Sequence, residues 1–317
     1  MDYARGIAIL LILIGHSNGM SNFETKLIYS FHVPLFFVIS GMLMRYTNAA
    51  DKPWKGILSG WLNRIIIPSV IWEIILSAFY FVIKDIPPKQ LILNSVTLHF
   101  NLSVLWFIPC LLLAEAIWIV ILKSRKQGYP AYIYGAIAIA FMVGAMIMPV
   151  LFLKRILVAE VFVVCGYILE LIWQRNKLVP SALIKLIFFL VLIIWLVSAV
   201  VNVKADLSAG ILGNVVLYYL HSLSGSLVVI WVCRYLPGNL PLLGWIGKNT
   251  LGFLVTHVFV RHVIIVAEEM LLGYFWGGWL LAVPMIIIDI VAVWLIGRVV
   301  PEVFGQKRMK TGVEENE

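Results

Sequence analysis

The sequence predicts an all-α fold, a polytopic transmembrane helical bundle of about ten spans. Of the 317 residues, 62% are hydrophobic and only 13% are charged, whereas soluble domains carry roughly 25% charged residues. The mean hydropathy is +1.00. No soluble fold of this length could bury so much apolar surface, and the alternating pattern of a membrane β-barrel is absent.

Ten apolar runs approach the roughly 20 residues that a helix needs to cross the hydrocarbon core. They are residues 5–21, 31–46, 65–84, 104–122, 130–150, 155–173, 183–202, 209–233, 249–268 and 277–299. The first run lacks a cleavage site, so we interpret it as a retained span. The tight 151–155 junction predicts a close hairpin between the fifth and sixth spans. We expect one membrane domain over 1–302 and a disordered cytoplasmic tail over 303–317.

The basic residues predict that both termini are cytoplasmic. With this arrangement, 17 of the 24 Lys and Arg residues fall on the inner side, as the positive-inside rule requires. The outer side holds Lys26, Lys84, Lys89, Lys154, Arg155, Lys204 and Arg261. The net charge of +8 is therefore explained by the orientation of the spans in the membrane, and nucleic-acid binding is not expected.

The first apolar run carries two costly polar residues. In a helix, Arg5 and His16 would lie about 16 Å apart on one face. Burial there is costly unless they face a partner or a polar cavity, and a buried imidazole suits a general base. Alternatively, His16 bonds a neighbouring helix, while Arg5 sets topology and pairs with Asp2. Ser17 and Asn18 favour a wet pocket.

The second run, FHVPLFFVISG, carries His32, Pro34, Ser40 and Gly41. Proline is well tolerated in the first turn of a helix, so Pro34 marks a helix start. Small residues at mid-span let helices approach closely. We therefore expect this helix to pack against the first one through Ser40 and Gly41.

A basic rim precedes the third span, in WLNRIIIPS. Arg64 is suited to bidentate contact with phosphates of a cytosolic donor. Arg45, Lys52 and Lys55 add to the same rim, and Pro68 follows one turn after Arg64. The alternative is that these cations only obey the positive-inside rule.

Acidic residues inside spans mark sites or partners by default. They are Glu73, Glu115, Glu160 and Asp289. Neither HExxH nor CxxC occurs, so no metal site is expected, and the three isolated cysteines are interpreted as small core residues.

Two later segments add polar or aromatic candidates. His257 lies mid-span in LGFLVTHVFVRH, with Arg261 and His262 one turn further out, as a second polar cluster. Trp106 in LWFIP opens the fourth span, where it also suits an interface anchor.

The order Arg5-x10-His16, FHVPLFFVISG, Arg64-x-x-x-Pro68 and LWFIP resembles the acyltransferase 3 family of integral membrane acyltransferases. It is most similar to the stand-alone sugar O-acetyltransferase (fucose 4-O-acetylase-like) branch, over about residues 1–300. Members use cytosolic acyl-CoA to modify a hydroxyl of an envelope glycan or a related acceptor. The resemblance implies a multi-pass protein of the bacterial plasma membrane that takes acetyl-CoA as donor without a metal.

The resemblance also assigns roles. His16 and Arg5 are the expected catalytic pair, and Arg64, Arg45 and Lys55 are expected to hold the donor. For the substrate we expect contacts from His32, Ser40, Glu73, Trp106 and His257. Many members carry Arg-x-x-Arg where this chain has Trp61, so Lys55 or Arg45 would substitute for the first arginine.

The expected reaction has His16 remove the proton of the acceptor hydroxyl while Arg5 orients the donor; an acyl-histidine intermediate is equally open. Many relatives carry an extracytoplasmic SGNH hydrolase domain, and we expect this chain to pass the acyl group directly to its acceptor or to a partner protein. A transporter or flippase of an envelope saccharide is the rival function, and a membrane subunit or sensor without catalysis is a third. The acceptor, the acyl chain and the oligomeric state, including a homo-oligomer, stay open.

Overall fold

The computed structural model confirms an all-α helical bundle. It describes residues 1–96, 104–124, 128–175, 181–274 and 277–306, and within these ranges strand-like pairing is limited to one isolated bridge. Each predicted apolar range contains a helix: α1 (Asp2–Gly15), α3 (His32–Tyr46), α5 (Ile67–Lys84), α7 (Phe107–Lys123), α8 (Ala131–Ile147), α9 (Leu151–Arg175), α10 (Ser181–Val201), α11 (Val215–Tyr235), α13 (Thr250–Leu272) and α14 (Gly278–Val299).

Eight helices within the described ranges are long and apolar enough to cross a membrane. The apolar helix α8 has 17 residues and α1 has 14, so both are shorter than a full span. The chain is therefore a multi-pass membrane protein. The count of ten and the orientation of the termini stay predictions.

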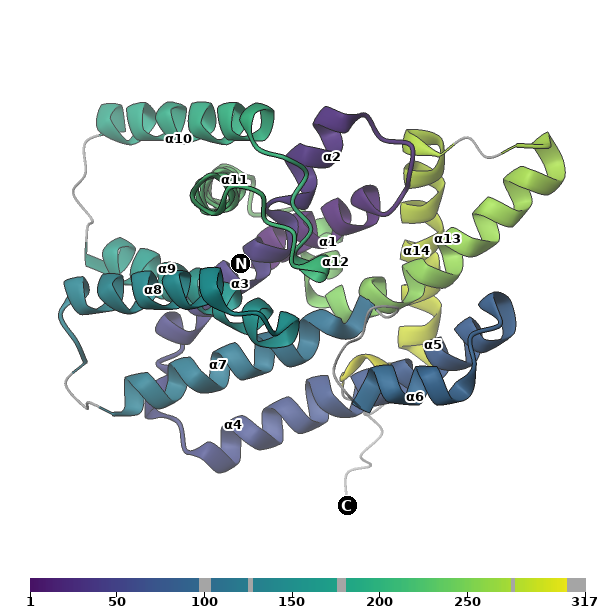
Figure 1. Cartoon of the computed structure of the whole chain (residues 1–317), viewed down its shortest axis with the longest axis horizontal. Helices are drawn as coiled ribbons and strands as arrows, with labels where there is room; N and C mark the ends of the chain where they lie inside the picture. Colours follow the sequence, from purple (N-terminus) through teal and green to yellow (C-terminus); the bar gives the residue numbers. More distant parts are fainter. Residues whose placement is uncertain (97–103, 125–127, 176–180, 275–276, 307–317) are drawn as a thin grey trace, which may run out of the picture.

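Helix α1 lies in the middle of the molecule (Figure 1). It packs against α3, α13, α14 and two short helices, α2 (Asn22–Tyr29) and α12 (Pro241–Lys248). The α1–α12 contact is close because a Cβ at Gly247 would collide with the carbonyl oxygen of Asp2. Placing α1 at the centre explains how a short, partly polar helix is kept from lipid.

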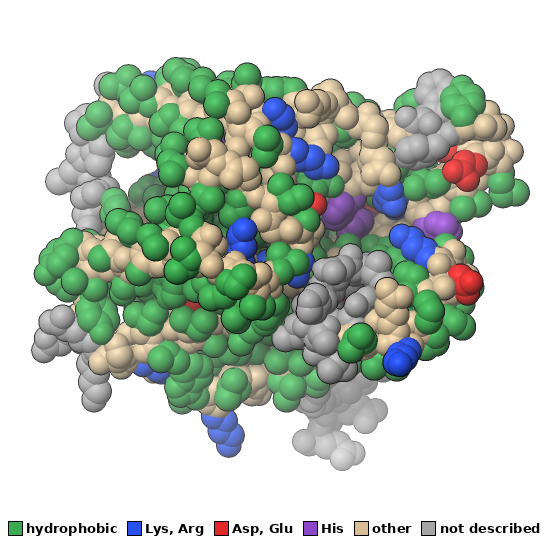
Figure 2. Space-filling model, viewed as in Figure 1, with side chains coloured by type: hydrophobic (Ala, Val, Ile, Leu, Met, Phe, Trp, Pro, Cys, Tyr) green, Lys and Arg blue, Asp and Glu red, His purple; other side chains and the backbone are tan. Residues whose placement is uncertain are grey.

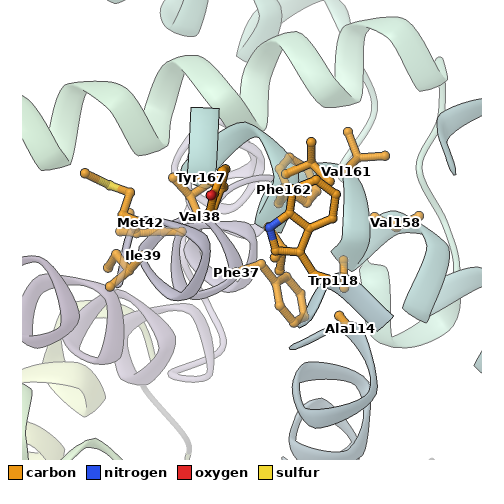
Figure 3. Close-up of a cluster of buried hydrophobic side chains, with 14 of the residues drawn as sticks. Phe37, Val38, Ile39, Met42, Ala114, Trp118, Val158, Val161, Phe162 and Tyr167 are labelled. Atoms are coloured by element: carbon orange, nitrogen blue, oxygen red, sulfur yellow. The ribbon is translucent and has the colours of Figure 1, made fainter. Parts of the chain in front are cut away.

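Helices α3, α7 and α9 form a tightly packed group (Figure 3). A Cβ at Gly41 would collide with the carbonyl oxygen of Val163, and one at Gly166 with that of Val38. The expectation that Gly41 and Ser40 pack on α1 is therefore wrong in this detail. Helix α3 does contact α1, but Gly41 faces α9, and Ser40 donates a hydrogen bond to Glu115 of α7.

A π-helical turn interrupts the helix that carries the basic rim. α4 (Trp54–Trp61) continues through η2 (Leu62–Ile66) into α5, and the amide of Ile67 donates to the carbonyl of Leu62. Pro68 explains this, because it has no N–H for the carbonyl of Arg64 and its ring crowds that carbonyl. π-Helical turns occur frequently at functional sites.

Helices α8 and α9 pack together across the short connection at 148–150, which confirms the predicted hairpin. At the other end of the chain, η5 (Pro301–Phe304) folds against α5 and α14. The ring of Phe304 stacks on Trp72 with centroids 5.9 Å apart, and the side chain of Gln306 donates to that of Asn249. The folded part thus reaches Gln306, beyond the predicted boundary at 302, and the rest of the predicted tail lies outside the described residues.

Candidate functional site

One face of α1 lines a cavity of about 1120 Å³. The residues on that face are Arg5, Ile9, Ile12 and His16. Their spacing, i, i+4, i+7 and i+11, is that of one helical face, which confirms the prediction that Arg5 and His16 share a face. The cavity therefore connects the two polar residues that the sequence singles out.

The basic end of the cavity is the part lined by Arg5, Lys52, Arg64 and Lys248. Nη1 of Arg5 lies 3.3 Å from Oδ1 of Asp2, the pairing expected from their spacing. The π-helical turn brings the Arg64 side chain to the cavity while its carbonyl side is packed closely against Gly305. Four cations from four separate segments thus surround one end.

A half-buried carboxylate lies in the cavity wall beside the basic end. Glu115 accepts hydrogen bonds at Oε1 from the Ser40 hydroxyl and at Oε2 from the indole N–H of Trp61, the latter at 3.0 Å. All three residues line the cavity. Trp61 therefore supplies a neutral donor to an acidic partner.

The stretch between the basic end and His16 is apolar. Ile9 and Ile12 lie between Arg5 and His16 on α1, and Phe36 and Ile39 of α3 and Leu254 of α13 line the same cavity. These side chains offer no hydrogen-bonding group, so the middle of the cavity suits a thin, largely apolar chain.

His16 is hydrogen-bonded to a second histidine from α13. Nδ1 of His16 lies 2.9 Å from Nε2 of His257, and the two ring planes differ by only 5°. With so short a separation between the nitrogens, the rings lie edge to edge in nearly one plane. His257 is itself buried, and its Nδ1 lies 3.0 Å from the carbonyl oxygen of Phe253.

These contacts fix the protonation pattern of two neutral rings. A carbonyl oxygen can only accept, so Nδ1 of His257 carries the proton and its Nε2 carries a lone pair. Nδ1 of His16 must then donate to that lone pair, which leaves Nε2 of His16 unprotonated. His16 lines the cavity, and its tautomer is the one that a general base requires.

The end of α1 is also anchored at the backbone. His16 caps the helix, where carbonyl groups lack intrahelical partners. Nε of Arg261 donates to the His16 carbonyl at 2.8 Å, and the hydroxyl of Tyr29 donates to the Gly15 carbonyl at 3.1 Å. Both the ring and the backbone of His16 are thus held in place.

We call the region around His16, Tyr29 and His32 the histidine end of the cavity. Nδ1 of His32 donates to the carbonyl of Ile28 at 2.7 Å, so Nε2 of its neutral ring is an acceptor. The ammonium of Lys204 lies 4.0 Å from the centre of the Tyr29 ring. Figure 2 shows histidines near the centre of the face in view, with Lys and Arg side chains on several sides.

The structure brings together most of the predicted site residues. The cavity is lined by Arg5, His16, His32, Ser40, Arg64 and Trp106, and His257 lies behind His16. Arg45, Lys55 and Glu73 are not among its lining residues. Glu73 lines a separate, apolar cavity of about 740 Å³ between α5, α6 (Pro88–Val96) and α7.

Other lining residues were not assigned to the site from the sequence. They include Tyr29, Trp61, Arg155, Asp206 and Lys248, and the paired carboxylate Glu115. Of these, the sequence pointed only to Glu115, because an acidic residue within a span marks a site or a partner. Within the described ranges, no group of three His, Cys, Asp or Glu side chains is arranged to hold a metal ion.

The comparisons with known proteins agree with the resemblance seen in the sequence. A family model for the acyltransferase 3 family, described as an acyltransferase domain, matches residues 1–298. No curated protein and no solved structure matches the chain significantly.

Proposed function

Because the chain belongs to the acyltransferase 3 family and is therefore a membrane acyltransferase, we propose that it transfers an acyl group, expected to be acetyl, from acyl-CoA to a carbohydrate hydroxyl. The acceptor is an envelope carbohydrate or a lipid-linked saccharide, and the enzyme resides in the bacterial plasma membrane. One observation carries the proposal: a single cavity joins a cluster of cations to His16, whose free nitrogen suits a general base.

The donor occupies the basic end. Arg64 has the planar fork that suits phosphate oxygens, and Lys52 and Lys248 add point charges beside it. The pantetheine arm of the donor is long and thin, and it passes Ile9 and Ile12 to bring the thioester to His16. The distance from Arg5 to His16 along α1, about 16 Å, is comparable with part of that arm.

The acceptor hydroxyl meets the thioester at the histidine end. Nε2 of His16 takes the hydroxyl proton while the oxygen attacks the thioester carbonyl carbon. The tetrahedral intermediate then collapses, the C–S bond breaks, and the proton passes from His16 to the thiolate of CoA. The products are the O-acyl ester and free CoA. While His16 is protonated, His257 accepts from its Nδ1–H and so stabilises the positive ring.

Replacing His16 by Ala tests this assignment. The purified protein in lipid nanodiscs would be assayed for transfer of labelled acetyl from acetyl-CoA to extracted envelope glycans. We expect about a 10²- to 10⁴-fold loss of rate, the usual contribution of a general base, with membrane insertion unchanged. Full activity of the variant would overturn the assignment.

Donor binding separates an acyltransferase from the rival transporter. We expect acetyl-CoA to bind the purified protein and Arg64→Ala to weaken that binding. Lys185→Ala is the matched control, because Lys185 is an exposed cation on α10 that does not line the cavity. A protein that moves saccharides without binding acetyl-CoA would contradict the proposal.

A further inference from the structure

We propose that Arg155, assisted by Lys204, forms an anion-binding subsite at the histidine end, and that the acceptor saccharide is acidic. The recognised group is a carboxylate or a phosphate on the sugar. This inference deepens the proposed function and rests on it, because it identifies the bound saccharide as the acceptor.

Arg155 is a buried cation that makes few hydrogen bonds to the described residues. It lies on α9, lines the cavity and is only 1% exposed. One terminal nitrogen donates to the carbonyl of Ser208, and the guanidinium lies 5.0 Å from the centre of the Trp106 ring. Its Nε has no hydrogen-bond partner among the described residues. Guanidinium groups carry five N–H donors, so this one can still bind an anion.

Arg155 makes no ion pair with a carboxylate of the described residues, although the charge of Asp206 partly compensates it. Asp206 lies close enough to interact electrostatically with Tyr29, His32 and Arg155, which places all of them at one end, but it is not within ion-pair distance of the guanidinium. Its Oδ1 already accepts from the amide and hydroxyl of Ser208 and from the amide of Ala209. A buried charge without a partner is costly, and an anionic ligand would remove that cost.

The surroundings favour an anion over a neutral sugar. Lys204 lies over the Tyr29 ring and Arg261 holds the His16 carbonyl, so both add positive charge next to this end although neither lines the cavity. Among the described residues that line this end, Asp206 is the acidic one. In Figure 2, Lys and Arg side chains lie on several sides of the histidines near the centre, and an acidic side chain lies beside them.

The donor's own phosphates are not the ligand of this subsite. They belong at the basic end, and the apolar middle of the cavity separates that end from Arg155. The group bound at Arg155 must therefore be carried by the other substrate. An arginine beside an aromatic ring also presents its planar fork in a fixed orientation, which suits two oxygens of one anion.

The competing explanation is that Arg155 only fastens α9 to η4 (Leu207–Ala209) through the Ser208 carbonyl. A structural role of this kind would change stability for all ligands alike. A subsite would instead change the preference between charged and neutral sugars. The experiment is therefore a comparison of acceptors.

Three probes are compared in binding and in acetyl transfer: methyl β-glucoside, methyl β-glucuronide and methyl β-glucoside 6-phosphate. We expect the wild-type protein to bind an acidic probe at least about tenfold more tightly than the neutral one, since hydrogen bonds to charged groups are stronger than those between neutral groups. The two acidic arms distinguish a carboxylate from a phosphate.

Arg155→Gln should abolish the preference and leave binding of the neutral probe unchanged, while Arg155→Lys should retain part of it. Lys154→Gln is the matched control. Lys154 is the adjacent cation on α9, its ammonium donates to the Gly210 carbonyl, and it does not line the cavity. This control should keep the full preference.

Equal binding of all three probes, or an equal loss of preference in Lys154→Gln, overturns the subsite. Binding is measured without acetyl-CoA, so it does not depend on catalysis. Selective binding through Arg155 without any acetyl transfer would keep the subsite and reject the proposed function. Acetyl transfer to all three probes without a preference for charge would reject the subsite and keep the proposed function.

Discussion

At the scale of single residues, His257 determines what His16 can do. Nε2 of His257 accepts a hydrogen bond from Nδ1–H of His16, and Nδ1–H of His257 donates to the Phe253 carbonyl, which fixes the ring. This makes His257 a positioning residue, because it does not line the cavity and acts through His16.

We predict that His257→Ala lowers kcat roughly 10- to 100-fold, the usual effect of losing a residue that orients a reactive imidazole, with little change in KM for acetyl-CoA. His257→Gln should recover part of the rate, because its amide oxygen can accept from Nδ1 of His16. Steady-state kinetics measure both. His262→Ala is the control, since His262 contacts the Phe79 ring and does not line the cavity. An equal loss in both His257 variants would indicate a packing role instead.

The contact between Trp61 and Glu115 gives a second prediction at this scale. Trp61→Phe leaves Oε2 of a half-buried carboxyl without its donor, which should lower the free energy of unfolding by about 1 kcal/mol. Trp279→Phe removes the same type of hydrogen bond, to Glu24, but at an exposed position. Thermal unfolding in detergent should therefore show a much smaller shift for Trp279→Phe. Similar shifts would contradict the explanation.

The sequence predicts the residues of the site better than their contacts. The shared face of Arg5 and His16 follows from helical spacing alone. By contrast, the partner of His16 lies 241 residues further along the chain, and only the packing of α13 against α1 brings it there. The sequence predicted only that Arg155 is an outer-side cation, because the residues next to it on α9 do not indicate its contact with Ser208.

At the scale of elements, the close approach of α3 and α9 depends on two glycines. Gly41→Ala places a methyl group against the Val163 carbonyl, and backbone atoms cannot yield as a flexible side chain can. We expect a destabilisation of about 1–3 kcal/mol, as for overpacked cores. Gly135→Ala on α8 is the matched control, because a Cβ there meets nothing within 4 Å. It should be neutral or slightly stabilising, and a loss equal to that of Gly41→Ala would refute the argument.

Element positions were predictable where hydrophobic runs are long. The ten predicted ranges each contain a helix, since a run of about 20 apolar residues has few other ways to satisfy its backbone in lipid. The short helices α2, α4 and α12 were not predicted because their length gives no spanning signal. The π-helical turn at Arg64 was also missed, although Pro68 supplies its physical cause.

At the scale of the whole molecule, the predicted topology places the two ends of the cavity on opposite sides of the membrane. Lys52→Cys at the basic end should react with a membrane-impermeant maleimide only from the cytoplasmic side. Ser208→Cys at the histidine end should react only from the outside. Labelling of intact cells and of inverted vesicles measures this, with the unmodified chain as the background control. Reaction of both positions from one side would contradict the predicted topology.

The apolar middle of the cavity also has an electrical consequence. Ile9, Ile12 and Ile39 form a stretch without hydrogen-bonding side-chain groups between the basic end and His16. Protons and ions need such groups or continuous water to move, so this stretch insulates one compartment from the other while a thin organic chain lies within it. A protein with this arrangement can bring reactants together from two sides and still leave the membrane potential intact.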